Sequence, residues 1–182
     1  MRSVKRFADI ALALPLLVLA SPVVAIAALA IRLTSEGPAL FSQTRLGREE
    51  IPFRCRKLRT MVLGTPSGAT HEIPQSAVTP LGRILRRYKV DELPQLWNVL
   101  AGEMSLVGPR PCLPQQTVLV EHRRKLDVYS IRPGITGLAQ VRGIDMSDPA
   151  GCAAADAEYL ETASAGLDAQ ILLRTVIPSR RR

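Results

Sequence analysis

With 182 residues, the chain can bury one modest hydrophobic core, and its length does not require a second large domain. The formal net charge of +8 indicates an anionic partner: a nucleic acid, an acidic lipid or a phosphorylated substrate. Aromatic residues make up only 4% of the sequence, too few for a surface that stacks bases, so we expect no nucleic acid partner.

The first predicted element is an apolar helix. Residues 10–31 are all apolar, small or proline, and a helix of this length reaches about 33 Å, enough to cross a bilayer. Basic residues lie on both sides of the run, which favours the cytoplasm at both ends. Pro15 and Pro22 each remove a backbone hydrogen bond near the middle of this helix, and the Ser21 hydroxyl can bond to a carbonyl that a proline leaves free. A re-entrant helical hairpin and a kinked spanning helix are therefore equally compatible with the residues.

A small β-hairpin is predicted next. The turn at 35–38 is followed by two short runs with strand character, at 40–45 and 51–58. Residues 62–78 are rich in Gly, Pro, Ser and Thr and have no helical or strand period, so they predict a loop. This loop is the best candidate for a lid over a substrate.

Two helices are predicted after the loop. Thr79 and Pro80 fit the N-cap and first position of a short basic helix. In the next helix Asp91 is the expected N-cap, so that Asp91 and Glu92 lie together at a helix N-terminus. The apolar stripe of this helix is expected to contain Leu93, Leu96, Trp97 and Leu100.

The C-terminal part is predicted to be mostly helical. Its expected elements are a rigid turn at 108–111, a helix at 115–129, a loop at 132–137 that leads to a short strand, a helix from Asp148 to about residue 164, a helix at 167–176 and a basic tail. A small β-hairpin in an otherwise mostly helical chain indicates an α+β fold.

Asp91 and Glu92 are the main candidates for chemistry. A carboxylate at a helix N-terminus stays ionised, and it can act as a nucleophile or as a Mg²⁺ ligand. Plain helix capping is the commoner role of such residues, and taken alone it explains both. Several cations nevertheless occur nearby in the expected elements, which suits a metal-bound phosphate: Lys57, Arg59, Arg86 and Arg110. Arg59 could instead belong to a solvated or headgroup-facing surface, whereas the prolines on both sides of Arg110 restrict its backbone and favour phosphate binding.

Several motifs occur together along almost the whole chain. They are KRFAD at 5–9, SP at 21–22, KLRTM at 57–61, TPLG at 79–82, DELPQLWNVL at 91–100, MSLVGPRP at 104–111 and RPGITGLAQV at 132–141. In these motifs the chain resembles the bacterial sugar transferases, also called monotopic phosphoglycosyl transferases. The alanine-rich stretch at 149–157 departs from the family pattern, which leaves the role of the C-terminal region open.

The resemblance implies a topology. Residues 1–34 would form a re-entrant membrane hairpin with Ser21 and Pro22 at its bend. Residues 35–182 would form a catalytic domain with amphipathic interfacial helices on the cytoplasmic face of the bacterial inner membrane. Anionic membrane lipids would be partners, and a homodimer is compatible with the sequence, which does not fix the oligomeric state.

The resemblance also implies a reaction. Asp91 would attack the β-phosphate of a UDP-sugar, release UMP and hold the phosphosugar until undecaprenyl phosphate takes it, as the first membrane step of surface glycan or exopolysaccharide synthesis. Asp91 and Glu92 would be catalytic and would bind Mg²⁺. Lys57, Arg86 and Arg110 would contact the phosphates or the nucleotide, and Arg59 is expected to bind substrate beside them.

Three alternatives stay open at this point. The chain could be a non-enzymatic basic membrane adaptor that binds acidic lipids, in which case Asp91 only caps its helix and Asp91→Asn is silent. It could be a membrane-tethered nucleic-acid binder, whose affinity would fall steeply with salt. It could also hydrolyse a nucleotide sugar without a lipid acceptor. The sequence does not identify the sugar.

Overall fold

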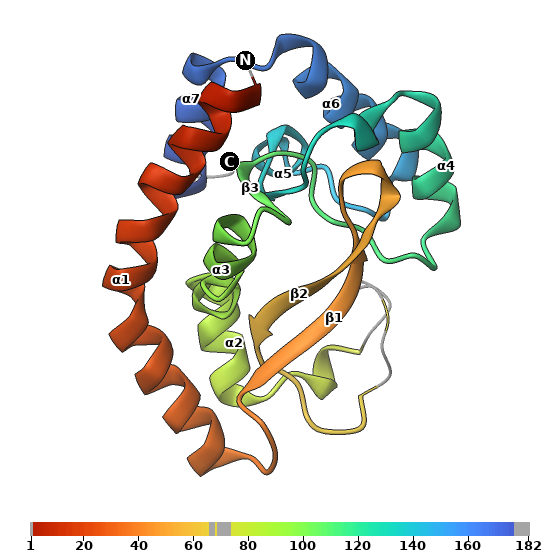
Figure 1. Cartoon of the computed structure of the whole chain (residues 1–182). Helices are drawn as coiled ribbons and strands as arrows, with labels where there is room; N and C mark the ends of the chain where they lie inside the picture. The colour runs from red at the N-terminus through yellow and green to blue at the C-terminus, as the bar shows by residue number, and fades with distance from the viewer. Residues whose placement is uncertain (1, 66–67, 69–73, 177–182) are drawn as a thin grey trace.

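The computed structural model describes residues 2–65, 68 and 74–176, and these form a mostly helical α+β structure, as predicted (Figure 1). The α-helices are α1 (Arg2–Thr34), α2 (Pro80–Arg87), α3 (Gln95–Leu100), α4 (Thr117–Lys125), α5 (Leu138–Arg142), α6 (Pro149–Thr162) and α7 (Ala165–Val176). The strands are β1 (Leu40–Leu46), β2 (Pro52–Leu58), β3 (Ser105–Val107) and β4 (Gly134–Thr136). Short 3-10 turns are η1 (Arg48–Glu50), η2 (Gln75–Ala77), η3 (Val90–Glu92) and η4 (Val128–Ser130).

Helix α1 is one continuous, curved helix that bows along one side of the molecule (Figure 1). Helical backbone runs through both Pro15 and Pro22, so the chain does not reverse at the Ser21–Pro22 pair. Pro22 has no N–H to give to the carbonyl of Val18, four residues earlier. The Ser21 hydroxyl donates to that carbonyl over 2.8 Å instead. The structure thus shows continuous helix at the predicted hairpin bend, where the serine satisfies the carbonyl that the proline leaves free.

Both ends of α1 are attached to the rest of the protein. Near its start, Arg6 donates to the carbonyls of Val99 and Leu100 at the end of α3, over 2.6 and 2.9 Å. Near its end, Ala27 and Ile31 pack in a cluster of buried side chains with α2 and β2. The most apolar window of α1 has a mean hydropathy of 2.5 and is only 11% buried, so its length and composition suit a membrane.

The β-hairpin formed by β1 and β2 confirms the two predicted strands. They pair antiparallel, with Leu40 opposite Leu58 at one end and Leu46 opposite Pro52 at the other. The buried amide of Asn98 in α3 clamps β2: its oxygen accepts from the N–H of Arg56 at 3.1 Å, and its nitrogen donates to the nearby carbonyl of Arg54 at 2.9 Å. This contact fixes the end of β2 that carries Lys57.

The two helices that follow agree with the prediction in part. Thr79 caps α2 as expected, because its hydroxyl accepts from the N–H of Gly82 at 2.9 Å. The next α-helix begins only at Gln95, and among the four residues of the predicted apolar stripe only Leu96 is fully buried. Trp97 is 54% exposed, and its ring lies against the guanidinium of Arg56.

The C-terminal part packs its helices around a pair of parallel strands, β3 and β4. Residues 134–136, predicted as loop, form β4, and the strand predicted after residue 137 is the short helix α5. Such short apolar runs cannot be assigned by period alone. Asp148 caps α6 as predicted, since its carboxylate accepts from Gly151 N at 3.0 Å. The candidate lid at 62–78 and the basic tail lie partly or wholly outside the described residues.

Candidate active site

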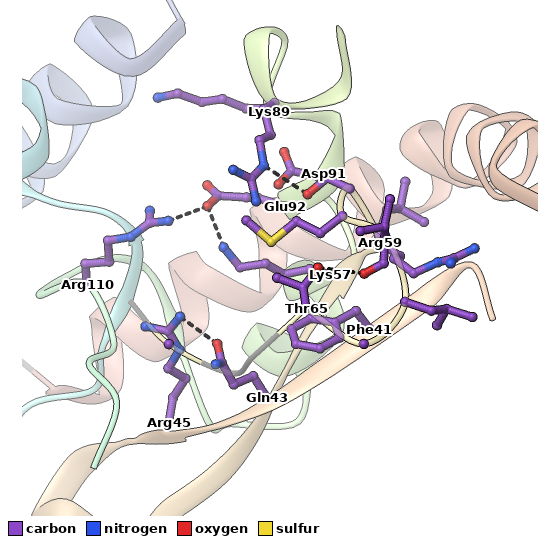
Figure 2. Close-up of a pocket in the computed structure, with 18 of the residues that line it drawn as sticks. Phe41, Gln43, Arg45, Lys57, Arg59, Thr65, Lys89, Asp91, Glu92 and Arg110 are labelled. Atoms are coloured by element: carbon purple, nitrogen blue, oxygen red, sulfur yellow. Dashed lines mark hydrogen bonds and ion pairs between the residues drawn. The ribbon is translucent and has the colours of Figure 1, made fainter. Parts of the chain in front are cut away.

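One cavity of about 360 Å³ opens between the β-hairpin, α2 and η3, and it contains the residues that the sequence singled out (Figure 2). Its polar and charged lining comprises Gln43, Arg45, Lys57, Arg59, Thr60, Thr65, Arg86, Lys89, Asp91, Glu92, Arg110 and Gln140. Six of these residues are Lys or Arg and two are acidic, so the charged groups of the lining favour an anionic ligand.

Asp91 lies in the 3-10 turn η3, between α2 and α3, and it is not the N-cap of a helix. The prediction of capping is wrong because Lys89 takes a left-handed conformation (φ 55°) and ends α2 just before the turn. The turn then directs the Asp91 side chain to the cavity. The residue is only 7% exposed.

Glu92 is held by two cations from opposite sides of the cavity. Its Oε1 atom accepts hydrogen bonds from Lys57 Nζ at 2.9 Å and from Arg110 Nη2 at 2.6 Å (Figure 2). Burial disfavours the ionised carboxylate, but the charges of Arg110 and Lys57 outweigh burial and hold the pKa of Glu92 well below its usual range. Glu92 is therefore a permanent anion that ties β2 to the 108–111 turn.

Asp91 is in the opposite situation. Burial, and then the negative charge of Glu92, raise the pKa of Asp91, and the charges of Lys57 and Arg86 offset this only partly. In the described part of the chain its carboxylate has no ion pair and no hydrogen bond to another side chain. A poorly solvated carboxylate without a side-chain partner is well suited to act as a nucleophile.

The predicted cations differ in what they contact. Lys57, Arg110 and Arg86 meet around the two carboxylates, and Arg86 Nε donates to the hydroxyl of Thr60 at 2.9 Å. Arg59 also lines the cavity, but its guanidinium donates to the carbonyls of Ser35, at 3.1 Å, and of Glu36. The geometry of Arg59 therefore points to a structural task, the fixing of the segment that leads from α1 to β1.

Oxygen donors for a Mg²⁺ ion are present. No group of three or more His, Cys, Asp or Glu side chains within residues 2–65, 68 and 74–176 could hold a metal ion. Mg²⁺ at phosphate-handling sites is usually bound by one or two carboxylates, with water and substrate phosphates completing the shell. Both cations reach Oε1 of Glu92, so the donors that fit the ion are the Asp91 carboxylate and Oε2 of Glu92.

Sequence reasoning assigned no role to several residues that line the cavity, among them Gln43, Arg45 and Lys89. Alternate residues of a strand share one face, so Gln43 and Arg45 lie on the same side of β1 as Phe41. Phe41 pairs with Lys57 across the hairpin. The two-residue period of the strands, counted from the partner of Lys57, could therefore have predicted that Gln43 and Arg45 line the cavity. No comparable sequence pattern indicates the left-handed conformation of Lys89.

Known proteins resemble this chain over most of its length. A family model described as bacterial sugar transferase matches residues 1–181. The UDP-glucose:undecaprenyl-phosphate glucose-1-phosphate transferase of Caulobacter vibrioides is 45% identical over 181 residues, which cover 94% of this chain and 68% of that protein. The enzyme of the same name from Escherichia coli is 42% identical over 148 residues, 78% of this chain and 32% of that protein.

A third relative acts on a different sugar. The UDP-N-acetylgalactosamine-undecaprenyl-phosphate N-acetylgalactosaminephosphotransferase of Aeromonas hydrophila is 35% identical over 182 residues, 95% of this chain and 43% of that protein. The chain thus spans about two thirds of the Caulobacter relative and less than half of the other two. The match over 1–181 and the identity to the Caulobacter protein show that this chain belongs to the bacterial sugar transferase family.

Proposed function

We propose that the protein transfers a sugar 1-phosphate from a UDP-sugar to undecaprenyl phosphate and releases UMP. The observation that carries the proposal is the pair of adjacent carboxylates in the cavity. Asp91 is buried and its carboxylate is bound by no side chain of the described residues, whereas Glu92 is held ionised by Lys57 and Arg110. The names of the relatives support the two substrates.

The chemistry runs in two displacements. An oxygen of the Asp91 carboxylate attacks the β-phosphorus and forms an oxygen–phosphorus bond, while the bond from that phosphorus to the bridging oxygen of the diphosphate breaks. UMP leaves with the bridging oxygen, and the sugar 1-phosphate stays on Asp91 as an acyl phosphate. A phosphate oxygen of undecaprenyl phosphate then attacks the same phosphorus and frees the carboxylate, a ping-pong course.

The cations of the cavity make this attack feasible. An anionic nucleophile and a diphosphate repel each other, and positive side chains in a site of low dielectric reduce that repulsion. Arg86 and Lys89 line the cavity beside Asp91 and contribute positive charge that Glu92 does not neutralise. Mg²⁺, when bound by Asp91 and Glu92, supplies further positive charge to the phosphates.

The membrane arrangement is part of the proposal. Both ends of α1 contact the same catalytic body, while the outward face of the helix is apolar. A helix that crossed the bilayer would carry its far end away from the body, so this double attachment supports a monotopic insertion in which both ends of α1 stay at one face of the membrane. With basic flanks on both sides, the catalytic body lies at the cytoplasmic face of the inner membrane, where anionic lipids attract the net positive charge.

The test uses detergent-solubilised protein and Asp91→Asn with Mg²⁺, undecaprenyl phosphate and a panel of UDP-sugars that includes UDP-glucose and UDP-N-acetylgalactosamine. We expect the parent to release UMP with at least one sugar and the variant to release none. UMP release by the variant at the parental rate would exclude Asp91 as the nucleophile.

The same assay separates the rival functions. A basic membrane adaptor predicts no UMP from either folded protein with any UDP-sugar. Hydrolysis of the nucleotide sugar predicts free sugar phosphate whether or not undecaprenyl phosphate is present. Transfer predicts a lipid-linked sugar that forms only when both substrates and Asp91 are present.

A further inference from the structure

The C-terminal helices contain a buried ion pair that has no role in the reaction proposed above. Arg123 of α4 and Asp156 of α6 are 1% and 2% exposed. Arg123 donates from Nε and Nη2 to the same oxygen of Asp156, over 2.9 and 2.6 Å. Two charges are withdrawn from water at considerable cost, and such a pair is weak evidence for stability alone. A third contact of Arg123 shows what the pair can do.

The remaining nitrogen of Arg123 reaches the active-site turn. Its Nη1 donates to the backbone carbonyl of Arg110 at 2.8 Å. Arg110 stands between Pro109 and Pro111, which have no N–H groups, so hydrogen bonds to carbonyls are the main means of fixing this turn. The neighbouring carbonyls of Pro109 and Pro111 are likewise held, by the N–H of Gly134 at 2.8 Å and by the side chain of Arg45 at 2.9 Å.

The contacts join into one chain that ends at the reacting group. Asp156 holds Arg123, Arg123 holds the backbone of Arg110, and the side chain of Arg110 holds Glu92 beside Asp91. Glu92 also accepts from Lys57, so a displaced Arg110 would disturb both cations. The position of Arg110 therefore depends on two helices that do not line the cavity.

We propose that Arg123, held by Asp156, is a positioning residue that sets Arg110 against Glu92 for phosphosugar transfer. The inference rests on the proposed function of the cavity. It gives α4 and α6 a task in the reaction, although neither helix contributes a residue to the cavity. Arginine is required because its planar fork can bind a carboxylate and a carbonyl at once, whereas one lysine ammonium cannot reproduce that geometry.

The experiment is a double-mutant cycle of Arg123→Lys and Arg110→Lys in the full chain, with kcat and KM for UMP release per folded molecule. Arg123→Lys keeps the charge beside Asp156 and removes the fork. Ile171→Val, a truncation at a buried position of α7 that does not line the cavity, is the control for loss of stability. If Arg123→Lys yields no folded protein, Asp156→Glu, which keeps the ion pair but lengthens it, takes its place in the cycle.

We expect Arg123→Lys to lower kcat by on the order of tenfold to a hundredfold, as small misplacements of binding groups do. In the Arg110→Lys background the same change should have little further effect, because the group that it positions is already altered. Ile171→Val should lower the melting temperature and leave kcat per folded molecule unchanged.

Two results would overturn the inference. Equal effects of Arg123→Lys in the presence and absence of Arg110 would show that Arg123 does not act through Arg110. A loss that disappears after correction for folded protein would reduce the ion pair to a structural role. UMP binding to each variant, measured by calorimetry, supplies a second cycle that is independent of turnover. If the parent protein binds UMP but releases none from any UDP-sugar, the proposed function is contradicted, and the binding cycle alone decides whether Arg123 positions Arg110. If the parent neither binds nor releases UMP, both the proposed function and the role of Arg123 are contradicted.

Discussion

Arg110 and Glu92 lie 18 positions apart in the chain, and their side chains meet at 2.6 Å on the wall of the cavity. Lys57 reaches the same carboxylate oxygen from β2 at 2.9 Å. Glu92 is therefore held as an anion, while the carboxylate of the adjacent Asp91 has no ion pair with a described side chain. Two neighbouring carboxylates thus have different tasks because the cations are distributed unequally between them.

Replacement of Glu92 tests its role as an organiser of the cations. Glu92→Gln removes the charge that holds Lys57 and Arg110 but keeps the shape of the side chain. We expect UMP release to fall by about 10²–10³-fold, a typical cost for the loss of a preorganised electrostatic contact. Glu158→Gln is a matched control, since Glu158 forms an exposed ion pair with Arg142 and neither residue lines the cavity. An unchanged rate in Glu92→Gln would contradict the assigned role.

The pH dependence follows from the raised pKa of Asp91. The attacking carboxylate must be ionised, so activity is lost as the pH falls through this pKa, which lies above the ordinary value of 3.8. Lys57 is one of the charges that lower it. Lys57→Met should therefore move the acid limb of the rate profile to higher pH, whatever its effect on the maximal rate.

The control for this shift is Arg83→Met. Arg83 is exposed on α2 and does not line the cavity, so its loss should leave the acid limb in place. A shift to lower pH in Lys57→Met would show that Lys57 does not stabilise ionised Asp91.

Arg59 offers a test of a structural role against a substrate-binding one. Its guanidinium is hydrogen-bonded to the segment between α1 and β1. Arg59→Met should lower the free energy of unfolding by about 1–3 kcal/mol, since several part-buried hydrogen bonds of a buried guanidinium are lost. Measured by thermal melting and by UMP release, the variant should keep KM for the UDP-sugar within a few-fold of the parent. A large rise in KM with unchanged stability would restore the original expectation of substrate binding.

The membrane arrangement can be tested by cysteine labelling. Ser3→Cys and Glu36→Cys place one reactive thiol at either end of α1, and the native Cys55, Cys112 and Cys152 are buried. A membrane-impermeant maleimide added to intact cells should label neither site, and both should react after permeabilisation. Labelling of one end from outside the cell would show a helix that crosses the membrane.

Local signals in the sequence were sufficient for much of the fold. The β-hairpin and the caps at Thr79 and Asp148 depend on residues close in sequence, and the structure confirms them. The late start of the second helix, at Gln95 and not after Asp91, could not be predicted in this way. It depends on a left-handed Lys89, a residue type that rarely adopts that conformation.

The candidate site, like the fold, could be predicted from the sequence only in part. The Asp91–Glu92 pair and the cluster of cations could be predicted from motifs and charge. Which cation binds which carboxylate could not, because Lys57 and Arg110 approach Glu92 across 35 and 18 positions of sequence. The pairing of Arg123 with Asp156 spans 33 positions, and the alanine-rich stretch around Asp156 offered no clue to it.

The most direct test of the account is the intact mass of the protein after incubation with Mg²⁺ and its UDP-sugar in the absence of undecaprenyl phosphate. The account predicts a mass gain of one sugar phosphate on Asp91, none on Asp91→Asn, and loss of the adduct when undecaprenyl phosphate is added. An active parent that never gains this mass, or an adduct of equal yield on Asp91→Asn, would contradict a covalent phosphosugar intermediate on Asp91.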